Sequence, residues 1–225
     1  MTAVLHPVPE NPLLIAEQWF RDACANKKRR NPGAMALATV SSEGRPSVRT
    51  VLLKELSDAS GYAVFYTHYG SRKANELEQN SRAAAVLYWE EFGRQLRFEG
   101  RVLRSPSAES DAYFLTRPWA SQLNAWASEQ SQAIASHEEL LRKARHQAAN
   151  FGVASDADFS QAEHAKLPRP PNWGGYRLWF EAIELWAEGG GRFHERVRYE
   201  RKLSAGDENT ASFVGGSWSV QILQP

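Results

Sequence analysis

The chain has 225 residues, and 27 Lys and Arg stand against 26 Asp and Glu, so the formal net charge is +1. This balance argues against a protein that binds nucleic acid with its whole surface, and any anion site must be built locally. No apolar run approaches the ~20 residues that cross a bilayer, and residues 1–10 lack the pattern of a secretory signal. The single cysteine, Cys24, excludes an intrachain disulfide and a multi-cysteine metal site. A cytoplasmic protein is the simplest interpretation.

The first half of the chain is predicted to be rich in strands. Residues 1–10 contain proline and show no period, which is typical of a flexible tail. Asn11 and Pro12 then favour a helix start, and the helix should end near Ala25, with Leu14 among its inward residues. Apolar and β-branched runs predict strands over 34–40, 47–54, 62–66, 83–89 and 95–103, with a short helix over 71–80.

The middle of the chain is predicted to be helical. One helix opens at Ser105 and stops at Arg117, because proline disfavours the helical conformation of the residue before it. A second covers about 119–127, and a third starts at the capping box of Ser136 and Glu139. Strand patterns return at 176–181, 183–186, 196–201 and 218–223. Strands at both ends with helices between predict a single barrel-like α+β domain over residues 11–225.

The sequence first opposes a local structural preference at Ser71, Arg72 and Lys73. A helix capped by Ser71 places two cations in its first turn, which opposes the helix dipole. A bound phosphate would reverse the sign of that interaction by meeting the free N–H groups and both side chains. An exposed basic turn is the alternative.

Two further conflicts involve cations on strands. Arg192, His194, Arg196 and Arg198 alternate, so on a strand they share one face and need an anionic or aromatic group opposite them. Arg49 and Lys54 fall on opposite faces of another strand, so at least one of them should meet a buried or interfacial partner. A lysine that reaches to solvent from the strand end is the alternative for Lys54.

Other chemistries find no support in the sequence. The six histidines lack metal-ligand spacing, and neither a nucleophile elbow nor a dinucleotide-binding glycine motif is present. Local anion sites in a strand-rich domain with abundant aromatic residues suit a phosphorylated, planar ligand.

Eight segments, taken together and in this order, carry a resemblance to a known family. They are Arg49–Lys54, Phe65–Lys73, Gly93–Leu96, Tyr113–Gln122, Ala125–Ser131, Trp173–Arg177, Glu184–Trp186 and Gly191–Arg196. Each is moderately specific alone, and their joint order is highly specific. The chain resembles the pyridoxine/pyridoxamine 5′-phosphate oxidase family from Asn11 to Pro225.

The resemblance implies an FMN-binding split β-barrel with flanking helices that forms a homodimer, with FMN at the subunit interface. Arg72 and Lys73 would take the FMN phosphate, while Arg192 and His194 would lie against the substrate's pyridine ring as the catalytic pair. The substrate phosphate would be held by Lys54, Tyr113, Arg117 and Ser121. The residues implied for FMN are Arg49, Thr50, Val51, Leu52, Leu53, Lys54, Tyr66, Thr67, Arg72, Lys73, Gln95, Gln130, Ser131, Trp186 and Arg196.

The implied activity is oxidation of pyridoxamine 5′-phosphate or pyridoxine 5′-phosphate to pyridoxal 5′-phosphate. O₂ would accept the electrons and leave as H₂O₂, with the flavin as the redox group. No metal, nucleic acid or membrane partner is implied.

The sequence departs from the family at two places, and two alternatives stay open. The family's basic N-terminal segment has no clear counterpart, and Ile222 stands where the family usually has arginine. Some relatives with this fold oxidise tricyclic intermediates late in phenazine biosynthesis, and others bind flavin without this catalysis. The phosphate clamp of Lys54, Tyr113, Arg117 and Ser121 argues against the phenazine alternative, because a phenazine precursor has no phosphate.

Overall fold

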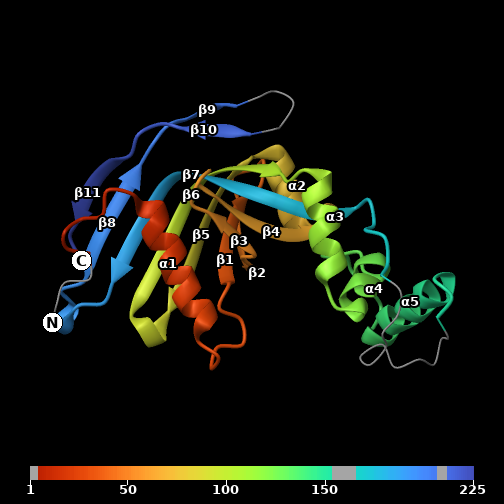
Figure 1. Cartoon of the computed structure of the whole chain (residues 1–225). Coiled ribbons are helices and arrows are strands. Elements are labelled where there is room, and N and C mark those ends of the chain that lie inside the picture. The colour runs from red at the N-terminus through yellow and green to blue at the C-terminus, as the bar shows by residue number, and fades with distance from the viewer. Residues whose placement is uncertain (1–4, 154–165, 207–211) are drawn as a thin grey trace. The chain divides into compact units, whose positions relative to one another are not determined.

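The computed structural model describes residues 5–153, 166–206 and 212–225 (Figure 1). These residues form two compact units. The described parts of residues 1–65, 76–104 and 176–225 make the first, and those of residues 66–75 and 105–175 make the second. The prediction of one domain over residues 11–225 stays a prediction.

A curled antiparallel sheet dominates the first unit (Figure 1). Its strands follow the order β11-β8-β7-β6-β5-β1-β2, while β3 pairs with β4 and β4 also pairs with β7. A separate two-stranded sheet joins β9 and β10. The bounds are β1 Ala34–Val40, β2 Pro46–Leu52, β3 Glu55–Ser57, β4 Tyr62–His68, β5 Arg82–Trp89, β6 Arg94–Arg104, β7 Trp173–Ala187, β8 Glu195–Glu200, β9 Leu203–Ala205, β10 Phe213–Gly215 and β11 Ser219–Leu223.

One face of this sheet is buried and packs against helix α1 (Pro12–Ala25). Asn11 accepts a hydrogen bond from the N–H of Leu13 at 3.0 Å, so the predicted cap is confirmed. Leu13 and Trp19 are buried, whereas Leu14, expected to face inward, is 52% exposed. The Arg94 guanidinium lies 5.2 Å from the Trp19 ring centroid and ties the helix to β6. Alternation in β6 places its polar side chains on the opposite face of the sheet, whereas the residues of β5 on that face are mostly apolar.

The two strands predicted over 176–181 and 183–186 are one continuous strand, β7. The pairing with β6 shifts register between Glu99 and Gly100, where Glu99 lies opposite Ala182 and Gly100 opposite Phe180. Glu181 is the extra residue of this β-bulge. A Cβ atom at Gly100 would lie 1.8 Å from the carbonyl oxygen of Trp179, so the close approach of the strands requires glycine.

The expected flexible tail differs from the structure at residues 5–10. Leu5 is 2% exposed, and its N–H donates to Glu195 Oε2 at 2.8 Å. The Tyr199 hydroxyl donates to the Pro9 carbonyl at 2.6 Å. This segment therefore packs on β8 through one apolar side chain and two hydrogen bonds, while residues 1–4 lie outside the described residues.

The second unit is built from helices around an aromatic core. Its helices are α3 (Ser107–Thr116), α4 (Trp119–Ala127) and α5 (His137–Asn150), together with the first turn of α2 (Arg72–Gln79). Ser136 accepts from the N–H of Glu139 at 3.1 Å, so the predicted α5 cap is confirmed. The core comprises Phe114, Trp119, Leu123, Ala125, Ala148, Leu167 and Trp173. Among the described helices of both units, none is long and apolar enough to cross a membrane.

Candidate functional site

Three residues implied for FMN lie in one row across the sheet of the first unit. Gln95 of β6 pairs with Trp186 of β7, and Trp186 pairs with Arg196 of β8. All three are half-buried and belong to the face of the sheet opposite α1. Tyr88 of β5 pairs with Gln95 and extends the row, and its ring lies 6.3 Å from that of Trp186. The row offers an amide, an indole and a guanidinium within three neighbouring strands.

Carboxylates lie beside Arg196 and Arg198 of β8, so the anionic groups expected opposite these two cations are supplied by the chain itself. Glu184 Oε1 accepts from Arg196 Nε at 3.1 Å and from Nη2 at 2.8 Å. Arg198 donates to both carboxylate oxygens of Glu99 at 3.0 Å, and its Nε donates to Glu200 at 2.9 Å. These contacts raise the pKa of Arg198 and lower that of Glu99.

Arg192 and His194 are not on the strand where the sequence placed them, because β8 begins at Glu195. Arg192 ends the short 3₁₀ turn η2 (Gly190–Arg192). The His194 ring lies 4.7 Å from the Trp186 ring, and its Nδ1 accepts from the Gly189 N–H at 3.2 Å. Arg192 and His194 therefore come from a loop beside the row.

Left-handed backbone marks two predicted site residues. Among the described residues, the non-glycine residues with positive φ are Ser131 at 75° and Arg192 at 68°. Such a conformation costs of the order of 1 kcal/mol for a side chain with a Cβ, and it clusters at functional sites. The two outliers support a functional role for both loops.

The buried partner expected for Arg49 is Glu76. Arg49 Nη2 lies 3.3 Å from Glu76 Oε2, and the same oxygen accepts from the hydroxyls of Thr39 and Ser47 at 2.5 and 2.7 Å. Strand β2 ends at Leu52, two residues earlier than predicted. Lys54 follows it and is exposed. Along this segment Val51 and Leu53 are buried, while Thr50 and Leu52 are exposed.

Three other residues implied for FMN meet in the second unit. Gln130 Oε1 accepts from Lys73 Nζ at 2.7 Å and from the Thr67 hydroxyl at 2.8 Å. Lys73 Nζ also donates to the hydroxyls of Thr67 and Ser71 at 3.1 and 3.2 Å. Lys73 is 6% exposed whereas Arg72 is exposed, so the alternative of an exposed basic turn fits Arg72 alone.

An aromatic stack in the second unit supports the arginine expected to bind the substrate phosphate. The Tyr66 ring stacks on Tyr113 at 4.0 Å and on Trp173 at 5.4 Å. The Arg117 guanidinium lies 4.5 Å from the Trp173 ring centroid. Arg117 Nη1 is buried without a hydrogen-bond partner among the described residues. Ser121, half-buried on α4, follows one turn after Arg117.

Burial shifts the pKa values of two groups around the Arg117 guanidinium. It lowers the pKa of Arg117 itself, although Tyr113 acts in the opposite direction. The pKa of His68 is lowered by burial first and then by the charges of Arg117 and Lys73. His68 Nδ1 is also buried without a partner among the described residues. This part of the second unit is therefore electropositive and carries unsatisfied polar atoms, as expected for an anion site.

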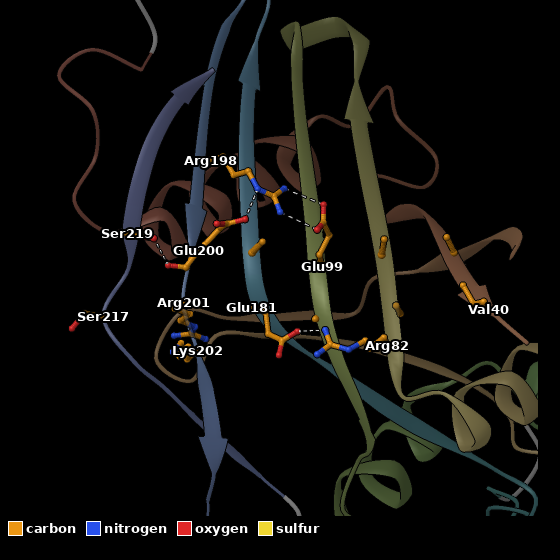
Figure 2. A pocket seen from close by; sticks show the side chains of 15 residues that line it. Val40, Arg82, Glu99, Glu181, Arg198, Glu200, Arg201, Lys202, Ser217 and Ser219 are labelled. Atoms are coloured by element: carbon orange, nitrogen blue, oxygen red, sulfur yellow. Dashed lines mark hydrogen bonds and ion pairs between the residues drawn. The ribbon is translucent and has the colours of Figure 1, made fainter. Parts of the chain in front are cut away.

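A cavity of about 770 Å³ opens on the sheet of the first unit, and none of the residues implied for FMN or for the substrate lines it. Figure 2 shows its ion pairs, Arg198 with Glu99 and Arg82 with Glu181. Its charges are largely paired within the wall. We therefore place the candidate functional site at the residues described above and not in this cavity.

Sequence reasoning missed four residues that shape these groups: His68, Glu76, Trp173 and Glu184. Three of them, His68, Trp173 and Glu184, lie in segments that carry the family resemblance, and two glycines follow Trp173. A Cβ at Gly174 would lie 2.0 Å from the Tyr69 hydroxyl oxygen, and one at Gly175 would lie 2.6 Å from Ser105 Oγ. The roles of His68, Glu76 and Glu184 depend on strand register and tertiary packing. No group of three or more metal-ligating side chains occurs in the described part of the chain.

Comparison with known proteins places this arrangement in a family. Residues 22–148 match the family model described as pyridoxamine 5′-phosphate oxidase, and residues 173–225 match a pyridoxine 5′-phosphate oxidase C-terminal dimerisation region. A pyridoxine/pyridoxamine 5′-phosphate oxidase of Paraburkholderia phytofirmans is 41% identical over 97% of this chain and 91% of its own. One from Rubrobacter xylanophilus is 45% identical over 92% of this chain and 84% of its own.

Solved structures confirm the α+β split-barrel fold. PhzG from Burkholderia lata 383, in complex with tetrahydrophenazine-1-carboxylic acid, superposes with a TM-score of 0.79 and 31% identity, over 100% of this chain and 98% of that one. A pyridoxamine 5′-phosphate oxidase-related, FMN-binding protein from Nostoc punctiforme shares the fold at a TM-score of 0.64 and 18% identity, with each chain fully covered. The family match and the 41–45% identity over most of the chain show that the protein belongs to the pyridoxine/pyridoxamine 5′-phosphate oxidase family.

Proposed function

We propose that the protein is an FMN-dependent oxidase that converts pyridoxamine 5′-phosphate or pyridoxine 5′-phosphate to pyridoxal 5′-phosphate, with O₂ as acceptor and H₂O₂ as product. Membership of the family supports the oxidase class. The observation that supports a phosphorylated substrate is the half-buried Arg117, whose Nη1 is buried and has no hydrogen-bond partner among the described residues. A cation with a buried donor that lacks a partner suits an anionic ligand.

The residues present fit FMN. The row of Gln95, Trp186 and Arg196 offers hydrogen-bond donors beside an aromatic ring, which suits a planar heterocycle. Arg72 and Lys73 at the start of α2, with Thr67, Gln130 and Ser131, offer cations and hydroxyls for a phosphate. Arg49 and residues 50–54 complete the proposed cofactor set with Tyr66. When bound, FMN would supply two-electron redox chemistry between C4′ of the substrate and O₂.

The chain's own contribution is binding and orientation. Arg117, Tyr113, Ser121 and Lys54 would hold the substrate phosphate, so binding energy remote from C4′ would orient the reacting carbon. The Nδ1 of His194 accepts a backbone hydrogen bond, which leaves the proton of the neutral ring on Nε2. That Nε2–H, with the Arg192 guanidinium, would face the substrate ring and help to orient it for reaction.

The dimerisation region matched at residues 173–225 supports a homodimer as the working form. The residues so matched include Arg192, His194 and Arg196, so assembly and catalysis would share one region of sequence.

A phenazine-type oxidase is the second candidate, because PhzG aligns over the whole chain at 31% identity. The ligand of that structure carries a carboxylate, which Arg117 could also bind. The two candidates differ in the need for phosphate: the proposed function requires it, and the alternative does not.

The test begins with the purified protein, which should be yellow and release FMN on denaturation. H₂O₂ release is then measured with pyridoxine 5′-phosphate, pyridoxamine 5′-phosphate, unphosphorylated pyridoxine and a dihydrophenazine carboxylic acid. Preferential turnover of the phosphorylated compounds over pyridoxine and the dihydrophenazine supports the proposal. Equal turnover of pyridoxine with and without phosphate contradicts the clamp, and turnover of the dihydrophenazine alone supports the second candidate. A protein that cannot be reconstituted with FMN contradicts both.

A further inference from the structure

Glu184 is a buried carboxylate that lies among the charged side chains on the exposed face of the sheet. It is 2% exposed and lies on β7 between Arg97 of β6 and Arg198 of β8 in the strand register. Its Oε2 accepts from Arg97 Nη1 at 2.8 Å, and its Oε1 accepts from Arg196 Nε and Nη2. A buried carboxylate is costly unless it is paired and hydrogen-bonded, and both of its oxygens are satisfied here.

The contacts of Arg196 leave part of its guanidinium available. Of its five N–H groups, Glu184 takes one on Nε and one on Nη2, and the Gln224 carbonyl takes one on Nη1 at 3.1 Å. Among the described residues no other acceptor bonds to this guanidinium. One N–H on each terminal nitrogen therefore remains to donate to a ligand.

Glu184 itself is held in place by a chain of alternating charges. Arg97 bonds to Glu184 and also to Glu99 at 3.2 Å. Glu99 bonds to Arg198, which reaches Glu200, as Figure 2 shows for the last three residues. The carboxylate of Glu184 cannot follow a movement of Arg196 without breaking its bond to Arg97, so it acts as a fixed support.

We propose that Glu184 is the positioning residue of the flavin site: it locks the Arg196 guanidinium so that its remaining terminal N–H pair meets the acceptor atoms of the flavin ring. This inference rests on the proposed FMN-dependent function. We assign Arg196 to the flavin ring of FMN, and not to its phosphate, because Arg196 shares its row with an amide and an indole. The basic residues suited to phosphate, Arg72 and Lys73, lie in the other unit.

The test measures flavin binding by the apoprotein, with flavin fluorescence quenching as the readout. Glu184→Gln should raise the Kd of FMN about tenfold, the effect of losing one well-placed hydrogen bond to a charged group. The Kd of riboflavin, which lacks the phosphate, should rise by the same factor. The matched control is Glu181→Gln, on the same strand, whose carboxylate pairs with Arg82 at 2.7 Å. This variant should leave both Kd values within twofold of wild type.

A double-mutant cycle separates positioning from general structural damage. In an Arg196→Gln background, Glu184→Gln should change the flavin Kd by less than twofold, because Glu184 acts through Arg196. A further tenfold loss in that background overturns the inference. A weakening confined to FMN also overturns the inference, because an unchanged Kd of riboflavin would show that the flavin ring is not involved.

Folding and the proposed function are checked separately. If Glu184→Gln does not fold, Glu184→Asp keeps the charge but shortens its reach, and it should still weaken both flavins. An unchanged Kd for that variant overturns the inference. Wild-type protein that binds neither flavin overturns the proposed function together with this inference, whereas wild-type binding with equal affinity in Glu184→Gln overturns the inference alone.

Discussion

Arg196 and Arg117 are both arginines expected to bind a ligand, and the protein surrounds them in opposite ways. Arg196, in the sheet of the first unit, has its charge balanced by the buried carboxylate of Glu184 at 2.8 Å. Arg117, in the helical second unit, rests on the Trp173 ring at 4.5 Å, and its buried Nη1 lacks a hydrogen-bond partner among the described residues. The charge of Arg196 is balanced within the protein before a ligand binds, whereas the charge of Arg117 is not.

The difference shows what each arginine is suited to do. A guanidinium already paired with a carboxylate contributes directed N–H groups but little net charge, which suits a neutral ring with carbonyl acceptors. A half-buried guanidinium without a carboxylate keeps its full charge where solvent screens it less, so it gains most from an anion such as a phosphate monoester. Pairing, and not residue type, separates ring recognition from phosphate recognition in this chain.

The largest effect is expected from a substitution at Arg117. Arg117→Ala should raise the KM for pyridoxine 5′-phosphate about 100-fold, because it removes a charge-assisted contact to the phosphate worth about 2.7 kcal/mol. FMN content should not change, and activity toward unphosphorylated pyridoxine should stay at its wild-type level. Steady-state H₂O₂ release and flavin absorbance measure these quantities.

The matched control is Arg142→Ala, which removes an exposed arginine of α5 that pairs with Glu139 at 2.6 Å. It should leave KM and FMN content unchanged. If Arg117→Ala lowers turnover of pyridoxine and its phosphate equally, Arg117 does not distinguish the phosphate and the contrast with Arg196 fails.

The fold could be predicted from the sequence wherever a local rule applied. The caps at Asn11 and Ser136 and the stop at Arg117-Pro118 were correct because capping and proline act within a few residues. The β-bulge at Glu181 was not predictable, because it depends on how β7 pairs with β6 and on the close approach at Gly100. The two strands expected there were wrong for that reason.

The candidate site was predictable as a set of residues and not as an arrangement. Alternating cations from Arg192 to Arg198 suggested one strand face, but the glycines before Arg192 form a 3₁₀ turn and the strand starts at Glu195. The carboxylates that pair with Arg196 and Arg198 come from β6, β7 and β8, and only the strand register brings Glu99 and Glu184 to them. Long-range pairing of this kind leaves no local pattern in one sequence.

His68 offers a second test, because it reports the uncompensated charge around Arg117. Burial and the charges of Arg117 and Lys73 lower its pKa below the ordinary value of 6.5. As the pH falls below 6.5, the unfolded chain binds a proton at His68 that the folded chain rejects, so the free energy of unfolding decreases. One proton limits this slope to about 1.4 kcal/mol per pH unit. His68→Asn should reduce the slope between the ordinary pKa and the depressed one, as measured by urea unfolding across that range.

The control for His68 is His146→Asn, since His146 is exposed on α5. Its replacement should leave the pH slope unchanged. In Arg117→Ala, the pKa of His68 followed by NMR should rise toward its ordinary value, because one of the two depressing charges is gone. A pKa of His68 that does not move in that variant contradicts the electrostatic contrast between the two arginines.

The smallest effect is expected at Glu99, which pairs with Arg198 at 3.0 Å but has a side chain that is 36% exposed. Arg198 lowers the pKa of Glu99, so the pair stabilises the fold above the ordinary carboxyl pKa, and this is lost as the pH falls through the depressed value. Solvent screening limits the gain, so Glu99→Gln should cost at most about 1 kcal/mol at neutral pH, less at high salt. Urea unfolding at two salt concentrations measures it, and flavin Kd should stay within twofold of wild type. A loss of flavin affinity as large as that of Glu184→Gln would mean that the whole charge chain, and not the buried carboxylate alone, positions Arg196.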